Sequence, residues 1–124
     1  MKSPLVLIVD DNHKNLKLAG DVLRAAGFRT LEAGRAAEGI ALAATHVPDV
    51  ILMDRRLPDM DGGEAARSLS RDARTAAIPV VALSASRLDR EWLLAAGFAG
   101  SLEKPISIDR FPEQVRSYCT GPER

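Results

Sequence analysis

The fold of this chain is decided by the stretch Val50-Ile51-Leu52-Met53-Asp54-Arg55-Arg56-Leu57-Pro58. The four apolar residues at 50–53 predict a strand that is buried on both faces, because a strand inside a parallel sheet has no side that faces water. Asp54 follows directly, and the proline, the two aspartates and the two glycines at 58–63 predict that the chain leaves the sheet there. Open α/β sheets hold their chemistry at the carboxyl ends of such strands, which is where Asp54 is expected to lie.

Segments of strand length and of helix length alternate on both sides of this stretch. Apolar or alternating runs predict further strands at 5–9, 28–32, 79–83 and 98–102, and apolar residues at helical spacing predict helices at 13–26, 35–45, 63–71, 87–96 and 107–119. Strands that alternate with helices require right-handed crossovers and a parallel sheet covered on both faces. We therefore expect an α/β, doubly wound fold with five strands and five helices.

Length and composition exclude several classes of protein. The 124 residues are enough for one domain, expected at 1–120, with a short tail at 121–124. Seventeen basic and seventeen acidic residues cancel, and no block rich in Lys and Arg predicts nucleic acid or an anionic membrane surface as a direct partner. The single cysteine, Cys119, cannot form an internal disulfide, and no apolar run approaches a membrane span. The composition predicts a cytoplasmic protein.

Polar residues follow four of the expected strands, at the point where each strand ends. They are Asp10 and Asp11, Asp54, Ser84, and Lys104. The carboxyl ends of parallel strands meet at one edge of the sheet, so these side chains are expected to lie together. Carboxylates that lie this close must take up protons or hold a cation. Mg²⁺ suits them because it prefers oxygen ligands, whereas softer metals need histidine or cysteine.

The same cluster predicts chemistry on a phosphoryl group. A bound cation, the Lys104 ammonium and the Ser84 hydroxyl would together suit the oxygens of a phosphoryl group. A carboxylate in such a site can act as the nucleophile and form an aspartyl-phosphate.

These motifs, taken in order, resemble those of the response-regulator receiver domains across essentially the whole chain. The matching segments are Asp10-Asp11, Met53-Asp54 with Leu57-Pro58, Ser84-Ala85, and Lys104-Pro105. The resemblance implies the flavodoxin-like receiver fold, with strand order 2-1-3-4-5. It also implies a cis peptide before Pro105, which would hold Lys104 aimed into the site.

The resemblance further implies a role for each residue of the cluster. Asp54 is the expected phosphoacceptor, and Ser84 and Lys104 are expected to contact the phosphoryl group. The expected Mg²⁺ ligands are Asp10, Asp11, Asp54 and the backbone carbonyl of Arg56. On this basis the protein is a phosphorylation-dependent switch of a two-component phosphorelay, and not an enzyme beyond its own Mg²⁺-dependent phosphotransfer and dephosphorylation.

The partners implied by the resemblance are proteins. A histidine kinase or a histidine phosphotransfer protein would donate the phosphoryl group, and the signal would pass to a downstream target by protein contacts, because the chain shows no separate output domain. The expected donor face comprises Asn12, Lys14, Asn15, Leu18, Pro105 and Ile106. A second face, expected to bind the target or a second copy in a homodimer, comprises Arg87, Arg90, Glu91, Trp92, Ser101 and the last helix.

Two residues depart from the family pattern. Ser101 stands three residues before Lys104, where the family usually carries a tyrosine or phenylalanine whose burial accompanies switching. A serine gains little from burial compared with an aromatic ring, so the two-state bias must come from elsewhere or the output must be read differently. Arg56 is the second departure, because its long cationic side chain is expected near the path of the water that hydrolyses the phosphoaspartate.

Three alternatives remain open on the sequence alone. A Mg²⁺-dependent phosphohydrolase would typically carry a second acid two residues after its nucleophile, where this chain has Arg56. A flavin-binding protein of this fold generally needs a Ser/Thr-rich phosphate loop, whereas Asp10-Asp11-Asn12 would repel the phosphate. A receiver-like module that binds partners without phosphorylation is kept open by Ser101, although the intact acid set argues against it.

Overall fold

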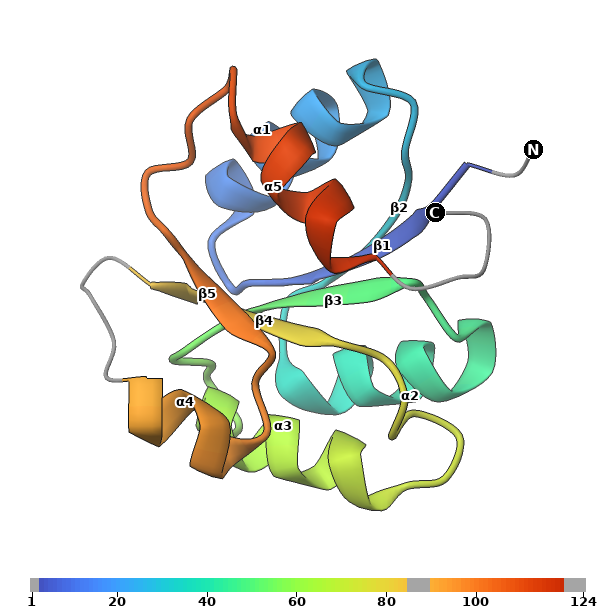
Figure 1. Ribbon diagram of the computed structural model, residues 1–124, viewed down its shortest axis with the longest axis vertical. Coiled ribbons are helices and arrows are strands. Elements are labelled where there is room, and N and C mark those ends of the chain that lie inside the picture. Colours follow the sequence, from blue (N-terminus) through green and yellow to red (C-terminus); the bar gives the residue numbers. More distant parts are fainter. Residues whose placement is uncertain (1–2, 85–89, 120–124) are drawn as a thin grey trace.

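The computed structural model describes residues 3–84 and 90–119, which form helices on both sides of a central sheet (Figure 1). In chain order the elements are β1 (Leu5–Val9), α1 (His13–Ala25), β2 (Arg29–Ala33), α2 (Ala36–His46), β3 (Val50–Asp54), α3 (Gly62–Arg71), β4 (Val80–Ser84), α4 (Arg90–Ala96), β5 (Gly100–Glu103) and α5 (Phe111–Tyr118). The predicted start of the fourth helix at residue 87, Ala85 of the Ser84-Ala85 motif and the predicted tail at 121–124 lie outside the described residues.

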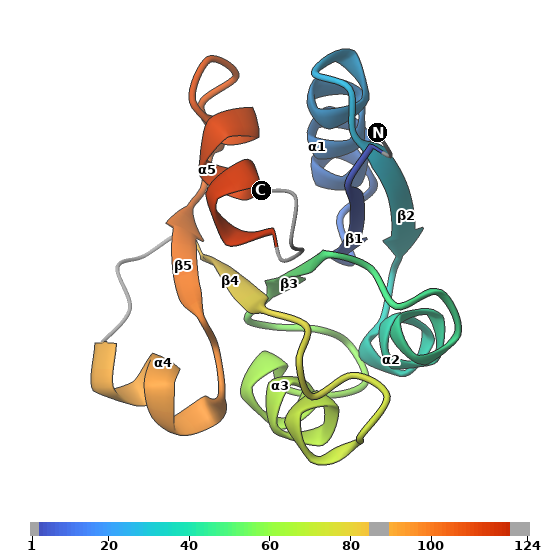
Figure 2. The same ribbon diagram turned by 45° about the vertical axis from the view of Figure 1, so that its right-hand side comes forward.

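The sheet is parallel throughout, with strand order β2-β1-β3-β4-β5. This order confirms the predicted doubly wound fold. Helices α1 and α5 cover one face of the sheet, and α2, α3 and α4 cover the other (Figure 2). The order reverses beside β1, so β1 and β3 are neighbours and their carboxyl ends meet at the switch point of the sheet, where open α/β sheets bind their ligands.

The core consists of two apolar layers, one on each face of the sheet. Val50 and Leu52 of β3 face the layer of α1 and α5, and Ile51 and Met53 face the layer of α2, α3 and α4. All four side chains are fully buried. The apolar run of β3 is therefore continuous because helices cover both of its faces.

Most boundaries lie within one residue of those predicted, but the last helix and the fifth strand begin later, and local hydrogen bonding explains both. The last helix begins at Phe111, because the amides of Arg110 and Phe111 both bond to the Ser107 carbonyl in a turn. Pro112 then occupies the first turn, where its missing N–H has no helical partner to lose. Strand β5 begins at Gly100, because the amide of Phe98 bonds back to Leu93 and closes α4.

The loops at the carboxyl edge are set by local caps. The Asn12 side chain accepts hydrogen bonds from the amides of Lys14 (2.9 Å) and Asn15 (3.2 Å), so α1 begins directly after the acid pair. Asparagine is among the residues most favoured at the N-cap position of a helix. Val47, which ends α2, has a left-handed backbone (φ 46°), an unfavourable conformation for a β-branched residue.

No helix among the described residues is both long enough and apolar enough to cross a membrane.

Candidate functional site

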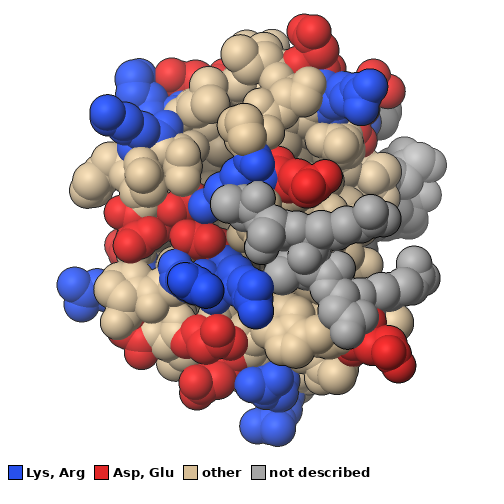
Figure 3. Space-filling view, turned by 90° about the vertical axis from the view of Figure 1, so that its left-hand side faces the viewer, with Lys and Arg blue, Asp and Glu red and all other residues tan. Residues whose placement is uncertain are grey.

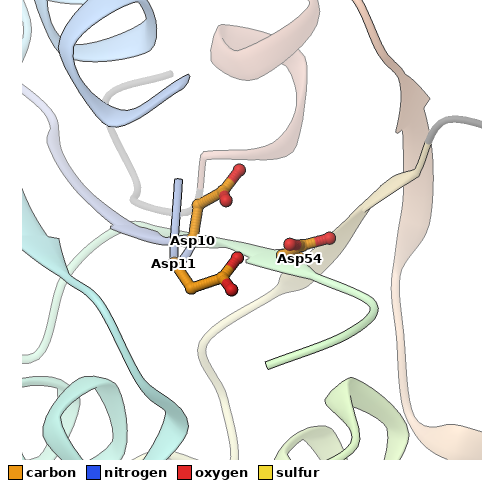
Figure 4. Close-up of side chains that lie close together, drawn as sticks. All are labelled: Asp10, Asp11 and Asp54. Atoms are coloured by element: carbon orange, nitrogen blue, oxygen red, sulfur yellow. The ribbon is translucent and has the colours of Figure 1, made fainter. Parts of the chain in front are cut away.

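Three carboxylates meet at the carboxyl edge of the sheet. Asp10 and Asp11 directly follow β1, and Asp54 ends β3, one residue beyond the paired residues Val9 and Met53. One oxygen of each carboxylate lies within 4.8 Å of the others (Figure 4). Asp10 is buried, Asp54 is half-buried and Asp11 is exposed. The structure therefore brings the three predicted acids together, with one side of the cluster open to solvent.

Asp10 is held rigidly by its neighbours. Its Oδ1 accepts a hydrogen bond from the Asn12 amide (2.9 Å), and its Oδ2 accepts one from the Asn15 side-chain amide (3.2 Å). The amide of Asp10 itself donates to the Ala33 carbonyl on β2 (3.0 Å). These bonds fix the direction of the buried carboxylate and compensate in part for its removal from water.

Lys104 supplies a positive charge to two of the three acids. Its Nζ lies 2.9 Å from Asp10 Oδ2 and 3.3 Å from Asp54 Oδ1. The Lys104 amide donates to the Ser84 carbonyl (2.8 Å), which ties the end of β5 to the end of β4. The peptide bond between Lys104 and Pro105 is cis, as the resemblance implied. Lys104 thus links three neighbouring strand ends through its backbone and its ammonium group.

The electrostatics of the site favour an additional cation. Burial, and then the negative charge of Asp10, raise the pKa of the Asp54 carboxyl above its ordinary value, and Lys104 offsets only part of this shift. Burial acts to lower the pKa of the Lys104 ammonium, but the hydrogen bonds and charges of Asp10 and Asp54 outweigh it, so this pKa is raised. The cluster offers only carboxylate oxygens, the ligands that Mg²⁺ prefers. These residues fit a magnesium ion.

Ser84 and the loop after β3 border the acids. Ser84 is the last residue of β4 and is buried, one position beyond Leu83, the partner of Asp54 in the sheet. The backbone amide of Arg56 donates a hydrogen bond to the Asp54 carboxylate, whereas the Arg56 side chain is exposed. The loop returns close to β3 at Gly62, where a Cβ atom would lie 2.6 Å from the Asp54 carbonyl oxygen. Glycine is therefore required there for the close return of the chain.

An aromatic side chain that was not predicted at the site contacts the residue that follows Asp54. The guanidinium of Arg55, the residue after Asp54, lies 5.1 Å from the ring centre of Trp92 on α4. Trp92 in turn stacks on Phe98, with ring centres 5.8 Å apart. Ser101 on β5 is half-buried and pairs with Ala82. The structure therefore places an aromatic ring on α4, beside Arg55, in a chain that lacks one at Ser101. No local sequence signal pairs residues 55 and 92.

The predicted donor face surrounds a small pocket at the edge of the site. The pocket has a volume of about 50 Å³ and is lined by Ile8, Asp10, Asn15, Leu18, Ala19, Leu83, Lys104, Pro105 and Ile106. Four of the six residues predicted for the donor face line it. Leu18 is 40 % exposed, so an apolar side chain stands beside the acids as expected. Figure 3 looks onto this side of the molecule, where acidic and basic side chains adjoin near the centre of the view.

Comparison with known proteins establishes the family. The family model of the response regulator receiver domain matches residues 6–116 of this chain. The chain belongs to this family. It is 39 % identical over 115 residues to the polar-differentiation response regulator DivK of Brucella ovis, a match that covers 91 % of this chain and 94 % of that protein.

Solved structures agree with this assignment. The receiver domain of a sensor histidine kinase from Pseudomonas aeruginosa PAO1 is 30 % identical, with a TM-score of 0.85 and coverage of 94 % of this chain and 97 % of that one. That structure has a magnesium ion coordinated in its active site cleft. The chemotaxis response regulator CheY4 of Vibrio cholerae, at 24 % identity, shares the fold with a TM-score of 0.88 and coverage of 94 % and 99 %.

Membership of this family decides against two of the three alternatives left open by the sequence. Receiver domains are phosphorylation-dependent switches of two-component signalling that interact with histidine kinases and downstream targets, and they are not enzymes in the ordinary sense. The signalling interpretation is therefore confirmed over a phosphohydrolase or a flavin-binding protein.

Proposed function

We propose that Asp54 of this receiver domain accepts a phosphoryl group from a phosphohistidine of a histidine kinase or a histidine phosphotransfer protein. An oxygen of the Asp54 carboxylate attacks phosphorus, the bond from phosphorus to the histidine nitrogen breaks, and the imidazole leaves with the electron pair of that bond. This proposal rests on the position of the Lys104 ammonium, which lies 2.9 Å from Asp10 and 3.3 Å from Asp54.

Asp54 suits the nucleophile better than its neighbour Asp10 does. Both oxygens of Asp10 are engaged by Asn12, Asn15 and Lys104, and its side chain is only 1 % exposed. The Asp54 side chain is 15 % exposed. A donor can therefore reach Asp54, whereas Asp10 serves to hold charge inside the site.

The proposed Mg²⁺ ligands are Asp10, Asp11, Asp54 and the backbone carbonyl of Arg56. When bound, the ion would supply positive charge to the phosphoryl oxygens. In the proposed phosphoform, the Lys104 ammonium and the Ser84 hydroxyl bind those oxygens. Lys104 Nζ already lies 3.3 Å from Asp54 Oδ1, and Ser84 directly follows Leu83, the partner of Asp54 in the sheet. In dephosphorylation, water attacks the same phosphorus, the bond from phosphorus to the Asp54 oxygen breaks, inorganic phosphate is released and the free carboxylate is restored.

The proposed donor surface is the pocket rim that includes Asn15, Leu18, Pro105 and Ile106. The proposed second surface, for a downstream target or a second copy of the chain, includes α4 and α5, where Leu94 is 58 % exposed. Histidine kinases present their phosphohistidine inside the cell, so we propose that the protein acts in the cytoplasm.

Intact mass after incubation with acetyl phosphate tests the assignment of the site. We expect one added phosphoryl group on the wild-type protein in Mg²⁺, and none in chelator or in Asp54→Ala. Asp72→Ala is the matched control, because Asp72 pairs with Arg74 on the surface outside the site. This control should be phosphorylated as the wild type is.

Two outcomes would contradict the proposal. A folded wild-type protein that gains no mass from acetyl phosphate or from a phosphorylated histidine phosphotransfer protein would show that the site does not accept a phosphoryl group. An adduct that persists in Asp54→Ala would place the phosphoryl group on another residue.

A further inference from the structure

The amino end of α2 is capped by a residue far away in the sequence. Arg35 occupies the N-cap position with an extended backbone (φ −150°, ψ 160°), but its side chain makes no capping hydrogen bond. Instead, Asp59 Oδ1 accepts from the Ala36 amide (2.8 Å) and Asp59 Oδ2 accepts from the Ala37 amide (2.9 Å). One carboxylate from the loop after β3 therefore binds two of the amides that a helix leaves unpaired at its start.

Asp59 lies at the tip of the loop that leaves the acid cluster. The base of this loop is closed by the bridge between Arg56 and Asp61 and by the hydrogen bond from the Gly62 amide to the Arg55 carbonyl (2.8 Å). At the tip, Leu57 and Met60 pack against the core on the side of α2, α3 and α4. The bonds of Asp59 to α2 are the polar attachment of this tip to the neighbouring helix.

The charge of Asp59 suits this position. The hydrogen bonds from the Ala37 amide, and then from the Ala36 amide, lower the pKa of the Asp59 carboxyl below its ordinary value. A carboxylate is also favoured at the positive end of the helix dipole. The attachment is therefore present at neutral pH, with Asp59 ionised.

We propose that Asp59 is a positioning residue for the metal site: by tying the loop after β3 to the start of α2, it holds the Arg56 carbonyl where it can act as a ligand. This inference rests on the proposed function, in which that carbonyl binds Mg²⁺. The three carboxylate ligands lie at or directly after the ends of β1 and β3. The fourth ligand, the Arg56 carbonyl, lies on the loop that Asp59 restrains. Mg²⁺ demands near-ideal octahedral geometry, so a displaced loop ligand weakens binding.

The expected effect on Mg²⁺ affinity is moderate. Residues that orient metal ligands from outside typically change affinity by 10–100-fold when removed. Asp59 acts through the loop and touches no ligand atom, and Leu57 and Met60 still pack at the tip. We therefore expect a loss at the low end of this range, about tenfold, in Asp59→Ala.

The test separates positioning of the loop from capping of the helix. Isothermal titration with MgCl₂ gives the dissociation constant, and thermal unfolding in chelator gives the stability of the same samples. The informative variant is Arg35→Ser with Asp59→Ala, which puts a good N-cap residue at the start of α2 and leaves the net charge of the wild type unchanged. It restores the cap without restoring the attachment of the loop.

Glu38→Ala is the matched control for charge. Glu38 lies in the first turn of α2 and accepts a hydrogen bond from the Gly34 amide (3.1 Å), so its removal takes one negative charge from the same helix end without touching the loop after β3. We expect Glu38→Ala to bind Mg²⁺ within about twofold of the wild type, because salt screens the interaction between an exposed carboxylate and an ion that it does not contact.

The proposal predicts that the double variant regains the melting temperature lost in Asp59→Ala but keeps the roughly tenfold weaker Mg²⁺ binding. Wild-type affinity in Asp59→Ala, recovery of affinity together with the cap, or an equal loss in Glu38→Ala would each overturn it. Failure of the proposed function can be told apart from failure of this inference about Asp59. In that case the wild type itself would bind no Mg²⁺, or would bind it equally well after Asp54→Asn.

Discussion

Replacing Lys104 with methionine is expected to destabilise the metal-free protein. The ammonium group lies 2.9 Å from Asp10 and 3.3 Å from Asp54, and the side chains of the three residues are 20 %, 1 % and 15 % exposed, respectively. Methionine retains most of the length of the aliphatic stem and removes the charge. The two carboxylates then face each other without the cation that separates them in the structure.

The size of the effect follows from this burial. Removing one partner of a buried ion pair costs about 3–5 kcal/mol. We expect about 3 kcal/mol, because Asp10 keeps its hydrogen bonds from Asn12 and Asn15 and because Asp54 can take up a proton. An unfolding entropy of about 2.1 cal/mol/K per residue, over 124 residues, converts this loss to a melting temperature lower by about 11 °C.

The assay is thermal unfolding followed by circular dichroism in chelator, with Lys17→Met as the matched control. Lys17 pairs with Asp21 at 3.1 Å on the surface, and its side chain is 80 % exposed. An exposed pair of this kind is worth less than about 0.5 kcal/mol, so the control should lose no more than about 2 °C. Saturating Mg²⁺ should narrow the deficit of Lys104→Met, because the ion supplies charge to the same carboxylates.

The pH dependence has a definite sign. The pKa of Asp54 is raised in the folded protein, chiefly by burial and then by the charge of Asp10. An ionised carboxyl of this kind costs stability at neutral pH, and the cost disappears as the pH falls through its folded-state pKa. The deficit of Lys104→Met should therefore shrink as the pH is lowered from neutrality. A loss no larger than that of Lys17→Met, or a deficit that grows on acidification, would refute the electrostatic account of the site.

Two further substitutions test separate features. Arg56→Ala is expected to change the lifetime of the phosphorylated protein, measured by intact mass over time, because Arg56 stands two residues after Asp54 and its side chain is exposed. An unchanged decay rate contradicts this, and Arg29→Ala at the far end of β2 is the control. Val47→Asn is expected to raise the melting temperature by about 4 °C, or about 1 kcal/mol, because asparagine tolerates the left-handed backbone at φ 46° and the valine is 56 % exposed. Thr45→Asn, on the helical part of α2, should give no such gain.

Much of the fold could be predicted because its signals are local. The continuous apolar run at 50–53 indicated a strand covered on both faces, and the structure buries all four residues completely. The boundaries were less predictable. The pattern of Ile108 and Phe111 suggested a helix from 107, but Ile108 is 63 % exposed and the turn closed on Ser107 delays the helix to Phe111. Periodicity does not report such hydrogen bonds.

The acid cluster could also be predicted, because each of its members ends a strand and parallel strands end at one edge. Asp10, Asp11 and Asp54 meet there, and Lys104 reaches two of them. The contact of Arg55 with Trp92 could not be predicted in the same way, because it joins a loop to a helix 37 positions further along the chain. The role of Asp54 as phosphoacceptor, the contacts of Ser84 and Lys104 with the phosphoryl group, and the Mg²⁺ ligands all stay predictions.

The sequence by itself determined the order of the elements, the faces they bury and the edge at which the acids gather, because these follow from periodicity and from strand ends. Only the tertiary structure decided which groups satisfy one another across that framework. Asp59 shows the difference: its local pattern indicates a turn, yet its carboxylate caps α2, whose own N-cap residue, Arg35, makes no such bond. Hydrogen bonds between distant segments depend on how whole elements pack, so a local sequence pattern does not predict which distant groups will meet.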